Sequence, residues 1–307
     1  MLTKKFGIEI ELTGITRDKA SKVVKKVMGG EITRQYDGYD TRKITAPDGR
    51  VWKVVSDSSL RAEKRGGTAS DIYKVEVVSP ILTANDFDSI QTLARELRGA
   101  GGFTNSTCGI HIHLDGADHT VRSIKNFIQI IASKNDLFYK ALQIEPARMR
   151  YCKKMDEELV RKIKTRKPQT MQAIKDIWYN ERNAGQHRHY HESRYHLLNL
   201  HSFFTNGTVE LRGFNSTLHA GKIKAYILLA LALNHQALTQ TKASSKKSQD
   251  ENEKFAMRVY LNRIGFIGAE YKNYRDHLIK HLDGSSAWRY GYDDPRYKKN
   301  KKKKEEK

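Results

Sequence analysis

The stretch Phe6-Gly7-Ile8-Glu9-Ile10-Glu11-Leu12 alternates apolar residues with small or acidic ones. Residues i and i+2 of a β-strand share a face, so this stretch predicts a strand with one aliphatic face and one face that carries Glu9 and Glu11. The two carboxylates would lie roughly 7 Å apart. Like charges at this spacing disfavour each other unless a cation neutralises them. The pattern therefore predicts a sheet with one polar face suited to cations.

Two later stretches repeat this alternation. Gly109-Ile110-His111-Ile112-His113-Leu114-Asp115 presents a His/His pair, and Thr208-Val209-Glu210-Leu211-Arg212-Gly213-Phe214 presents a Glu/Arg pair. Any one such pair is also typical of a solvent-exposed strand face. However, the chain has 56 Lys and Arg residues, and no lysine occurs on the polar faces of these three stretches. This favours one shared site, in which carboxylates and imidazoles would bind hard divalent cations and phosphates.

Strand and helix patterns alternate along the chain and predict an α+β fold. We expect a mostly antiparallel sheet with a polar, metal-binding open face and with helices packed on the other face. The Ala46-Pro47-Asp48-Gly49 and Asn206-Gly207 turn signals predict hairpins around them. Helices are expected at residues 16–28, 85–99 (capped by Asn85 or Asp86), 121–142, 155–167, 170–179 and 220–240, with one or two more ending near residue 282; further strands are expected at 39–44, 51–55, 73–78, 197–204 and 208–214, and a mobile loop at 61–71.

The composition of the chain indicates which partners and which cellular compartment to expect. The formal net charge of +21 implies attraction to polyanions such as nucleic acid, nucleotide phosphates or an acidic protein. The two cysteines, Cys108 and Cys152, lack zinc or disulfide-scaffold spacing. The longest apolar run, Tyr226 to Leu233, is far shorter than the ~20 residues that span a bilayer. We expect a cytoplasmic protein without a membrane partner.

Six short motifs follow one another within residues 5–235. Together they resemble the amidoligase branch of the glutamine synthetase-like carboxylate-amine ligases. The resemblance implies a single catalytic domain over residues 1–285, with a helical part at 220–285. The lysine-rich composition of residues 286–307 predicts a basic and disordered tail, with a nucleic-acid contact as the less favoured interpretation. The motifs are Gly7 to Glu11, Asp57-Ser58-Ser59-Leu60, Val75 to Pro80, Cys108 to His113, Arg194-Tyr195 with Leu198-Asn199-Leu200, and Gly207 to Arg212 with Thr217-Leu218.

The resemblance also implies a reaction and its cofactors. ATP would phosphorylate a carboxylate, and an amine would attack the acyl phosphate to form an amide. Two or more Mg²⁺ or Mn²⁺ ions would be needed. The substrates would be a carboxylate and an amine, carried by an amino acid, a peptide or a protein side chain.

The resemblance also implies roles for the residues of this chain that match the family motifs. Glu9, His111 and Glu210 would hold the metal that bridges the nucleotide phosphates, while Glu11 and Glu76 would hold a second metal near the carboxylate. Arg212 would reach the transferred phosphoryl group, His113 would contact the nucleotide phosphates, and Arg194 would add positive charge. Asp57 would activate the amine or bind its ammonium form, and an Asp-Ser-Ser turn cap is the structural alternative.

Other residues allow more than one interpretation. Arg148, Tyr151, Cys152 and Lys153 fall where such ligases often contact substrate, but a basic surface is preferred. The histidines at 187, 189, 191 and 196 could bind a metal, although the arginines between them favour a mobile phosphate-binding segment. Cys108 is expected to be a small buried thiol rather than a reactive one.

Two other functions compete with the ligase. Acidic pairs and the His-x-His motif could build a two-metal phosphoesterase or nuclease, and the positive charge would suit nucleic acid. A nucleic-acid-binding module without chemistry ranks last, because the sequence has no helix-turn-helix, zinc-finger or RNA-recognition signature.

Overall fold

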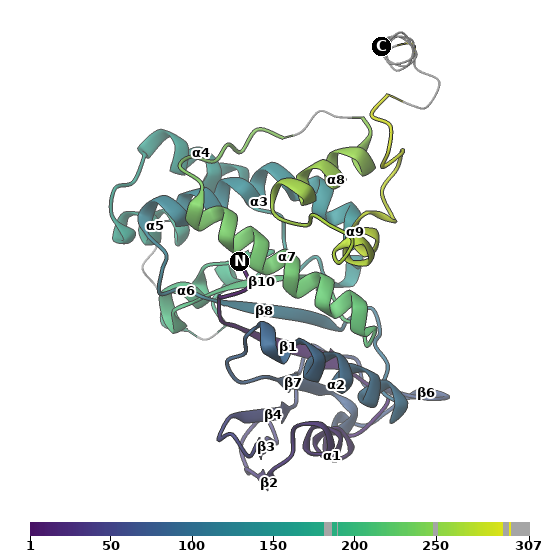
Figure 1. Ribbon diagram of the computed structural model, residues 1–307. Helices are drawn as coiled ribbons and strands as arrows, with labels where there is room; N and C mark the ends of the chain where they lie inside the picture. Colours follow the sequence, from purple (N-terminus) through teal and green to yellow (C-terminus); the bar gives the residue numbers. More distant parts are fainter. Residues whose placement is uncertain (181–185, 189, 248–250, 291–294, 296–307) are drawn as a thin grey trace.

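The computed structural model of the chain describes residues 1–180, 186–188, 190–247, 251–290 and 295. Its central element is an eight-stranded antiparallel sheet in the order β2-β3-β4-β7-β1-β8-β10-β9 (Figure 1). This sheet confirms the predicted fold class. The strands are β1 Phe6–Leu12, β2 Glu31–Arg34, β3 Arg42–Thr45, β4 Val51–Val55, β7 Val75–Val78, β8 Gly109–Asp115, β9 Leu198–Asn199 and β10 Thr208–Asn215.

Helices cover one face of this sheet. α1 packs on β3 and β4, α7 packs on β8, and α2 lies against both helices (Figure 1). The aliphatic strand faces, which include Ile8, Ile10, Ile110 and Ile112, are buried beneath this layer. Burial of the alternating apolar residues therefore leaves the polar strand faces on the opposite, open side. The bounds are α1 Arg17–Met28, α2 Phe87–Gly99 and α7 Ala220–Thr239.

The remaining helices extend the helical layer at the β10 end. α3 packs on α7 and α4, α4 contacts α5, and α9 lies against α7 and α8. The predicted helices at 121–142, 155–167 and 170–179 are confirmed, with small differences at their ends. No helix in the described part of the chain is long and apolar enough to cross a membrane. The bounds are α3 Val121–Ala141, α4 Glu157–Arg166, α5 Met171–Trp178, α8 Glu253–Arg263 and α9 Lys272–Ile279.

Capping residues explain where the first helix begins and ends. The Thr16 side chain accepts a hydrogen bond from the Lys19 N–H at 3.2 Å, which satisfies one of the free donors of α1. Gly29 ends the helix with a φ of 76°, which an L side chain rarely adopts. Both ends lie where the sequence predicts them.

The predicted hairpin around Asn206-Gly207 is wrong. Residues 197–204 do not form one strand: β9 covers only two residues, and helix α6, His201–Asn206, follows it. Asn199 Oδ1 accepts a hydrogen bond from the Ser202 N–H at 3.3 Å, beside the start of that helix. Gly207 is its left-handed C-cap, with a φ of 74°. An Asn-Gly pair serves a hairpin turn or a helix end equally well, and the local sequence does not distinguish them.

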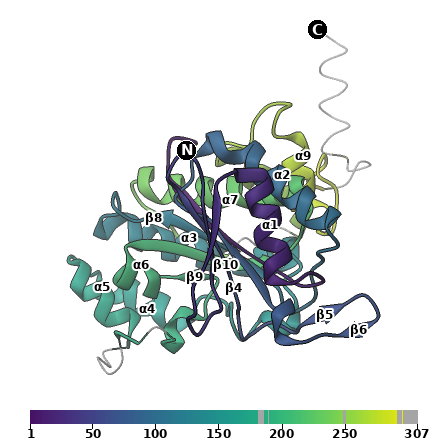
Figure 2. The same cartoon turned by 90° about the horizontal axis from the view of Figure 1, so that it is seen from below.

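Smaller differences concern the bounds and caps of individual elements. The predicted loop at 61–71 contains a short hairpin, β5 Glu63–Lys64 with β6 Gly67–Thr68, which projects from the body (Figure 2). The strands expected at 39–44 and 73–78 begin only at Arg42 and Val75, and β2 was not predicted. Asp86 precedes α2, but its carboxylate accepts from the Thr83 N–H rather than capping α2.

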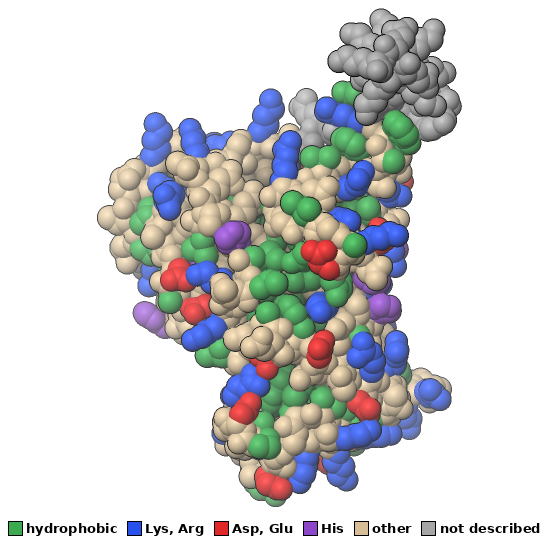
Figure 3. Space-filling view, in the orientation of Figure 1, with side chains coloured by type: hydrophobic (Ala, Val, Ile, Leu, Met, Phe, Trp, Pro, Cys, Tyr) green, Lys and Arg blue, Asp and Glu red, His purple; other side chains and the backbone are tan. Residues whose placement is uncertain are grey.

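The basic side chains are not gathered into one patch on the face drawn in Figure 3. Lys and Arg side chains spread across the face seen in Figure 3, mixed with acidic ones. Most of the predicted tail at 286–307 lies outside the described residues, as does His189.

Candidate active site

Strand register places the predicted site residues in rows across the open face. Glu9 of β1 faces His111 of β8, and Glu11 faces Glu76 of β7. His113 lies between Gly7 of β1 and Glu210 of β10. Cross-strand partners share a face, so residues far apart in the sequence meet on one surface.

At the centre of the site, the Glu9 carboxylate contacts two imidazoles. His111 Nδ1 lies 2.8 Å from Glu9 Oε2, and His113 Nε2 lies 3.2 Å from Glu9 Oε1. Burial would raise the pKa of Glu9, but the positive charge of His113 and the hydrogen bond to His111 hold it well below its ordinary value. Burial opposes protonation of His113, yet Glu9 and Glu210 raise its pKa to about 9. Imidazolium thus balances part of the acidic charge.

A second acidic group, formed by Glu11 and Glu76, lies beside these three residues. Glu11 and Glu76 are buried, and the Gly109 N–H donates to Glu11 Oε2 at 2.5 Å. Burial, followed by the charges of Glu9, Glu11 and Asp57, raises the pKa of Glu76 well above its ordinary value. Burial also raises the pKa of Glu11. This side of the cluster lacks enough positive charge to keep its carboxylates ionised.

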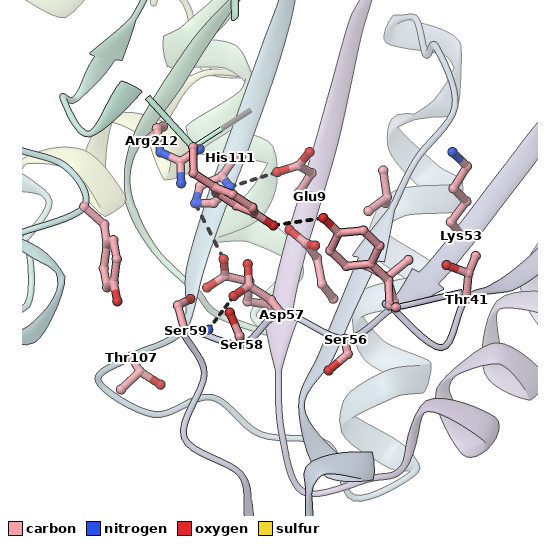
Figure 4. Close-up of a pocket in the computed structure, with 18 of the residues that line it drawn as sticks. Glu9, Thr41, Lys53, Ser56, Asp57, Ser58, Ser59, Thr107, His111 and Arg212 are labelled. Carbon is pink, nitrogen blue, oxygen red and sulfur yellow. Dashed lines mark hydrogen bonds and ion pairs between the residues drawn. The ribbon is translucent and has the colours of Figure 1, made fainter. Parts of the chain in front are cut away.

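Asp57 is a turn cap that also lies beside the acidic side chains. Its Oδ1 accepts the Ser59 N–H at 2.7 Å, which makes it a turn cap. One of its carboxylate oxygens also lies within 4.8 Å of ligand atoms of Glu11 and Glu76. The cap therefore holds the carboxylate beside the acidic group (Figure 4).

Arg212 and Glu210 form a buried ion pair on β10. Arg212 Nη1 contacts Glu210 Oε1, while Asn199 Nδ2 donates to Glu210 Oε2 at 2.6 Å. Burial would lower the pKa of Arg212, but Glu210, Glu9 and Glu11 raise it. The guanidinium is therefore a permanent positive charge at one side of the acidic cluster.

Three overlapping sets of side chains have the donors and spacing of cation sites. The ligand atoms within each set lie within 4.8 Å of one another. Clustered carboxylates beside imidazoles fit Mg²⁺ or Mn²⁺, because a cation would remove the repulsion between the carboxylates. Glu9 and Glu76 each belong to two sets. The sets are Glu9 with Glu76 and His111, Glu9 with His113 and Glu210, and Glu11 with Asp57 and Glu76.

Arg148 is a site residue that the sequence interpretation missed, because a basic surface was preferred there. The residue is buried, and its Nη2 donates to the Arg212 carbonyl at 2.8 Å. Its guanidinium passes over Gly109, where an added Cβ would lie 2.3 Å from Nη2. Glycine at this position therefore makes room for the arginine. Arg148 follows Pro146 in a short 3₁₀ turn, whose sequence has no helix or strand periodicity to signal burial.

The cluster forms the floor of a pocket of about 1070 Å³. Tyrosines form much of its wall, and the Tyr39 and Tyr190 hydroxyls lie 2.9 Å apart. The Arg194 guanidinium lies over the rings of Tyr190 and Tyr195, at 5.4 and 6.0 Å. Arg194 thus lines the pocket, and no specific sequence pattern indicates the tyrosines. Other lining residues are Gln35, Asp37, Thr41, Lys53, Val55, Ser56, Val78 and Tyr151.

The remaining candidates take structural positions. His191 stacks on His201, with ring centroids 5.5 Å apart, and His196 packs against Trp178. Among the described residues, neither histidine belongs to a group with metal-ligand spacing. Cys108 is buried, and burial raises the pKa of its thiol to about 12, so the prediction of an inert thiol agrees with the structure.

Comparison with known proteins gives the family. Among solved structures, the chain is similar to a bifunctional glutathione synthetase from Pasteurella multocida, with 12% sequence identity and a TM-score of 0.39. The match covers 91% of this chain but 47% of that one, so the chain spans about half of its length, and at this score the likeness carries no weight for function. Comparison with curated proteins finds no significant match. Residues 2–234 match the family described as "Putative amidoligase enzyme". Because this match spans most of the sequence and includes every residue of the acidic cluster, the chain belongs to the amidoligase family.

Proposed function

We propose that the protein is an ATP- and magnesium-dependent carboxylate-amine ligase whose catalytic unit is residues 1–285. One observation carries the proposal: Glu9, Glu11, Glu76, His111 and Glu210 converge on one sheet face beside the buried Arg212, in a chain of the amidoligase family. Paired carboxylates and a buried guanidinium are the groups that phosphoryl transfer requires.

The acidic residues would hold at least two divalent cations. Glu9 with His111 or His113 and Glu210 suits the ion nearer Arg212, and Glu11 with Glu76 suits the second. Carboxylate oxygens favour Mg²⁺, and the imidazoles make Mn²⁺ acceptable. His113 would give up its proton when a cation enters, because a cation and imidazolium compete for the same carboxylates.

The cationic residues would bind the nucleotide phosphates. Arg212 is held by Glu210 and offers a planar set of donors for phosphoryl oxygens. Arg194 adds a second guanidinium in the pocket lining, and His113 would add a ring nitrogen from beside Glu9. The tyrosines of the pocket wall would reduce the access of water to the activated substrate.

When bound, ATP supplies the phosphoryl group that converts the carboxylate into an acyl phosphate. The amine nitrogen then bonds to the acyl carbon, the bond from that carbon to the phosphate oxygen breaks, and the nitrogen loses a proton. Asp57 is the residue we assign to the amine, because its carboxylate is fixed at the edge of the acidic cluster by the Ser59 N–H. It would hold the ammonium form or accept the proton.

The substrates would be an amine and a carboxylate on an amino acid, a peptide or a protein side chain. The net charge of +21 supports an acidic partner or nucleic acid as a further ligand of the protein surface. We place this activity in the cytoplasm.

The test is ADP release with Mg²⁺ and pools of acids and amines, followed by oxygen tracing. Substrate labelled with ¹⁸O in the carboxylate should transfer label to inorganic phosphate, because the acyl phosphate keeps a carboxylate oxygen. Glu11→Gln and Glu210→Gln should abolish release, while the exposed Glu270→Gln should retain it. Metal-dependent nucleic-acid cleavage without ATP, or ADP release that never requires an amine, would overturn the proposal.

A further inference from the structure

Two lysines face each other on the open side of the sheet. Lys43 of β3 is the cross-strand partner of Lys53 of β4, so their side chains emerge from the same face. Lys53 is exposed and lines the pocket, and Lys43 is partly buried beside it. Like charges directly opposite each other on a sheet repel. This pair therefore needs an explanation.

Within the described residues, neither lysine has a hydrogen bond or an ion pair with an acidic side chain. Other cations of the same region are neutralised. Arg42, which points to the opposite face of β3, lies 2.7 Å from Asp18, and Arg34 of β2 lies 2.8 Å from Asp40. Uncompensated positive charge is thus confined to the open face of these strands.

The lysines lie in line with the metal-binding candidates. Lys53 faces Val78 of β7, Val78 faces Glu9, and Glu9 faces His111. With neighbouring strands about 4.8 Å apart, the Lys53 and Glu9 backbones are separated by about 10 Å. Figure 4 shows Lys53 on the side of Glu9 away from His111 and Arg212. Positive charge therefore flanks the acidic cluster on both sides.

The floor between the cluster and the lysines is apolar. Val78 and Val55 are partly exposed there and line the pocket. An aliphatic chain could lie over these valines with one end at the acidic cluster and the other end at Lys53. Its far end would need a negative charge to match the lysine pair.

We propose that Lys53 and Lys43 form an anion subsite for the acid substrate, which carries a second carboxylate on an aliphatic chain. The assignment rests on the proposed ligase function, which places the reacting carboxylate at the acidic cluster. The nucleotide phosphates would occupy the opposite side, where β10 carries Arg212 and the turn Glu192–Arg194 lies against β9. The subsite thus selects a dicarboxylic acid over a monocarboxylic acid of the same length.

Calorimetric titration tests this without turnover. The protein, saturated with Mg²⁺ and a non-hydrolysable ATP analogue, is titrated with glutarate, adipate and pimelate and with pentanoate, hexanoate and heptanoate. At least one dicarboxylate should bind more tightly than its matched monocarboxylate. Lys53→Met should weaken that binding about 5-fold, and Lys53→Met/Lys43→Met about 20-fold, as expected for exposed ion pairs. The exposed Lys22→Met on α1, on the opposite face of the same strands, should change nothing.

Reversing the charge at residue 53 should create a new ligand preference rather than only weaken binding. Lys53→Glu should bind 6-aminohexanoate more tightly than adipate, which reverses the wild-type order. The subsite is wrong if no dicarboxylate exceeds its monocarboxylate, if Lys53→Met keeps the preference, or if Lys53→Met weakens the nucleotide analogue instead. Dicarboxylate binding that depends on Lys53, without amine-dependent ADP release from any acid, would overturn the ligase proposal and leave the subsite.

Discussion

Asn199 donates a hydrogen bond from Nδ2 to Oε2 of Glu210 at 2.6 Å, and both side chains are buried. The other oxygen of Glu210 contacts Arg212. The Glu210 carboxylate is therefore fixed before any ligand arrives. Partners of this kind orient metal-binding side chains, and their loss commonly reduces metal affinity or activity about 10- to 100-fold.

Asn199→Ala should thus weaken Mn²⁺ binding by about 10-fold or more, because one oxygen of Glu210 becomes free to turn. Mn²⁺ titration calorimetry measures this directly, and the Mg²⁺ concentration for half-maximal ADP release gives a second readout. Asn262→Ala on α8 is the matched control and should bind Mn²⁺ like the wild type. An Asn199→Ala protein with unchanged Mn²⁺ affinity would show that Glu210 does not need this support.

Glu76→Gln should stabilise the metal-free protein and reduce the further stabilisation that Mg²⁺ gives. Burial and three neighbouring carboxylates raise the pKa of Glu76, so folding is penalised above the ordinary glutamate pKa and regains stability as pH falls. Glutamine mimics the protonated form and should add on the order of 1 kcal/mol at pH 8. Urea unfolding with EDTA and with Mg²⁺ checks both parts.

The Glu76 comparison has two controls. At pH 5 the advantage of Glu76→Gln should shrink, and Glu270→Gln should match the wild type at both pH values, because Glu270 is exposed. Equal stabilisation of Glu76→Gln and wild type by Mg²⁺ would contradict a role for Glu76 in metal binding.

Period-two alternation made the site strands predictable. Residues 6–12, 109–115 and 208–214 each show an aliphatic face that must be buried, so their polar residues had to share the other face. The strand order and the register are not encoded locally. The prediction grouped Glu9 with His111 and Glu210, whereas the β8 and β10 register also brings His113 beside Glu210.

The missed features lie in segments without periodicity. Arg148 enters the site from a 3₁₀ turn, and α6 occupies a stretch whose Phe203-Phe204 pair is equally typical of a strand. Lys43 and Lys53 are partners only through the register of β3 and β4. The register of pairing between segments, rather than local propensity, places these side chains.

Gly109→Ala should destabilise the protein by about 1 to 3 kcal/mol, because the new methyl group would overlap the Arg148 guanidinium. In an Arg148→Ala background the same substitution should have a much smaller effect. A double-mutant cycle of unfolding free energies measures this coupling. Additive effects would mean that the backbone at Gly109, rather than Arg148, resists the methyl group.

The buried His119 should make the stability of the protein depend on pH, at a position away from the site. Its ring lies between Ser123 Oγ at 3.0 Å and Asn234 Oδ1 at 2.8 Å, and burial lowers its pKa. The unfolded chain therefore takes up a proton at a higher pH than the folded protein does. Stability due to this group is complete above the ordinary pKa of about 6.5 and declines below it, by up to about 1.4 kcal/mol per pH unit, until the folded pKa is reached.

His119→Gln removes this titration. The difference in unfolding free energy between wild type and His119→Gln should be constant above pH 7 and should shift against the wild type as pH falls toward 5. Urea unfolding at several pH values measures it, with the exposed His187→Gln as a control for the substitution itself. If the difference in unfolding free energy between the wild type and His119→Gln stays constant across that range, protonation of the buried imidazole does not reduce stability. The polar contact between α3 and α7 must then be able to rearrange around the charge.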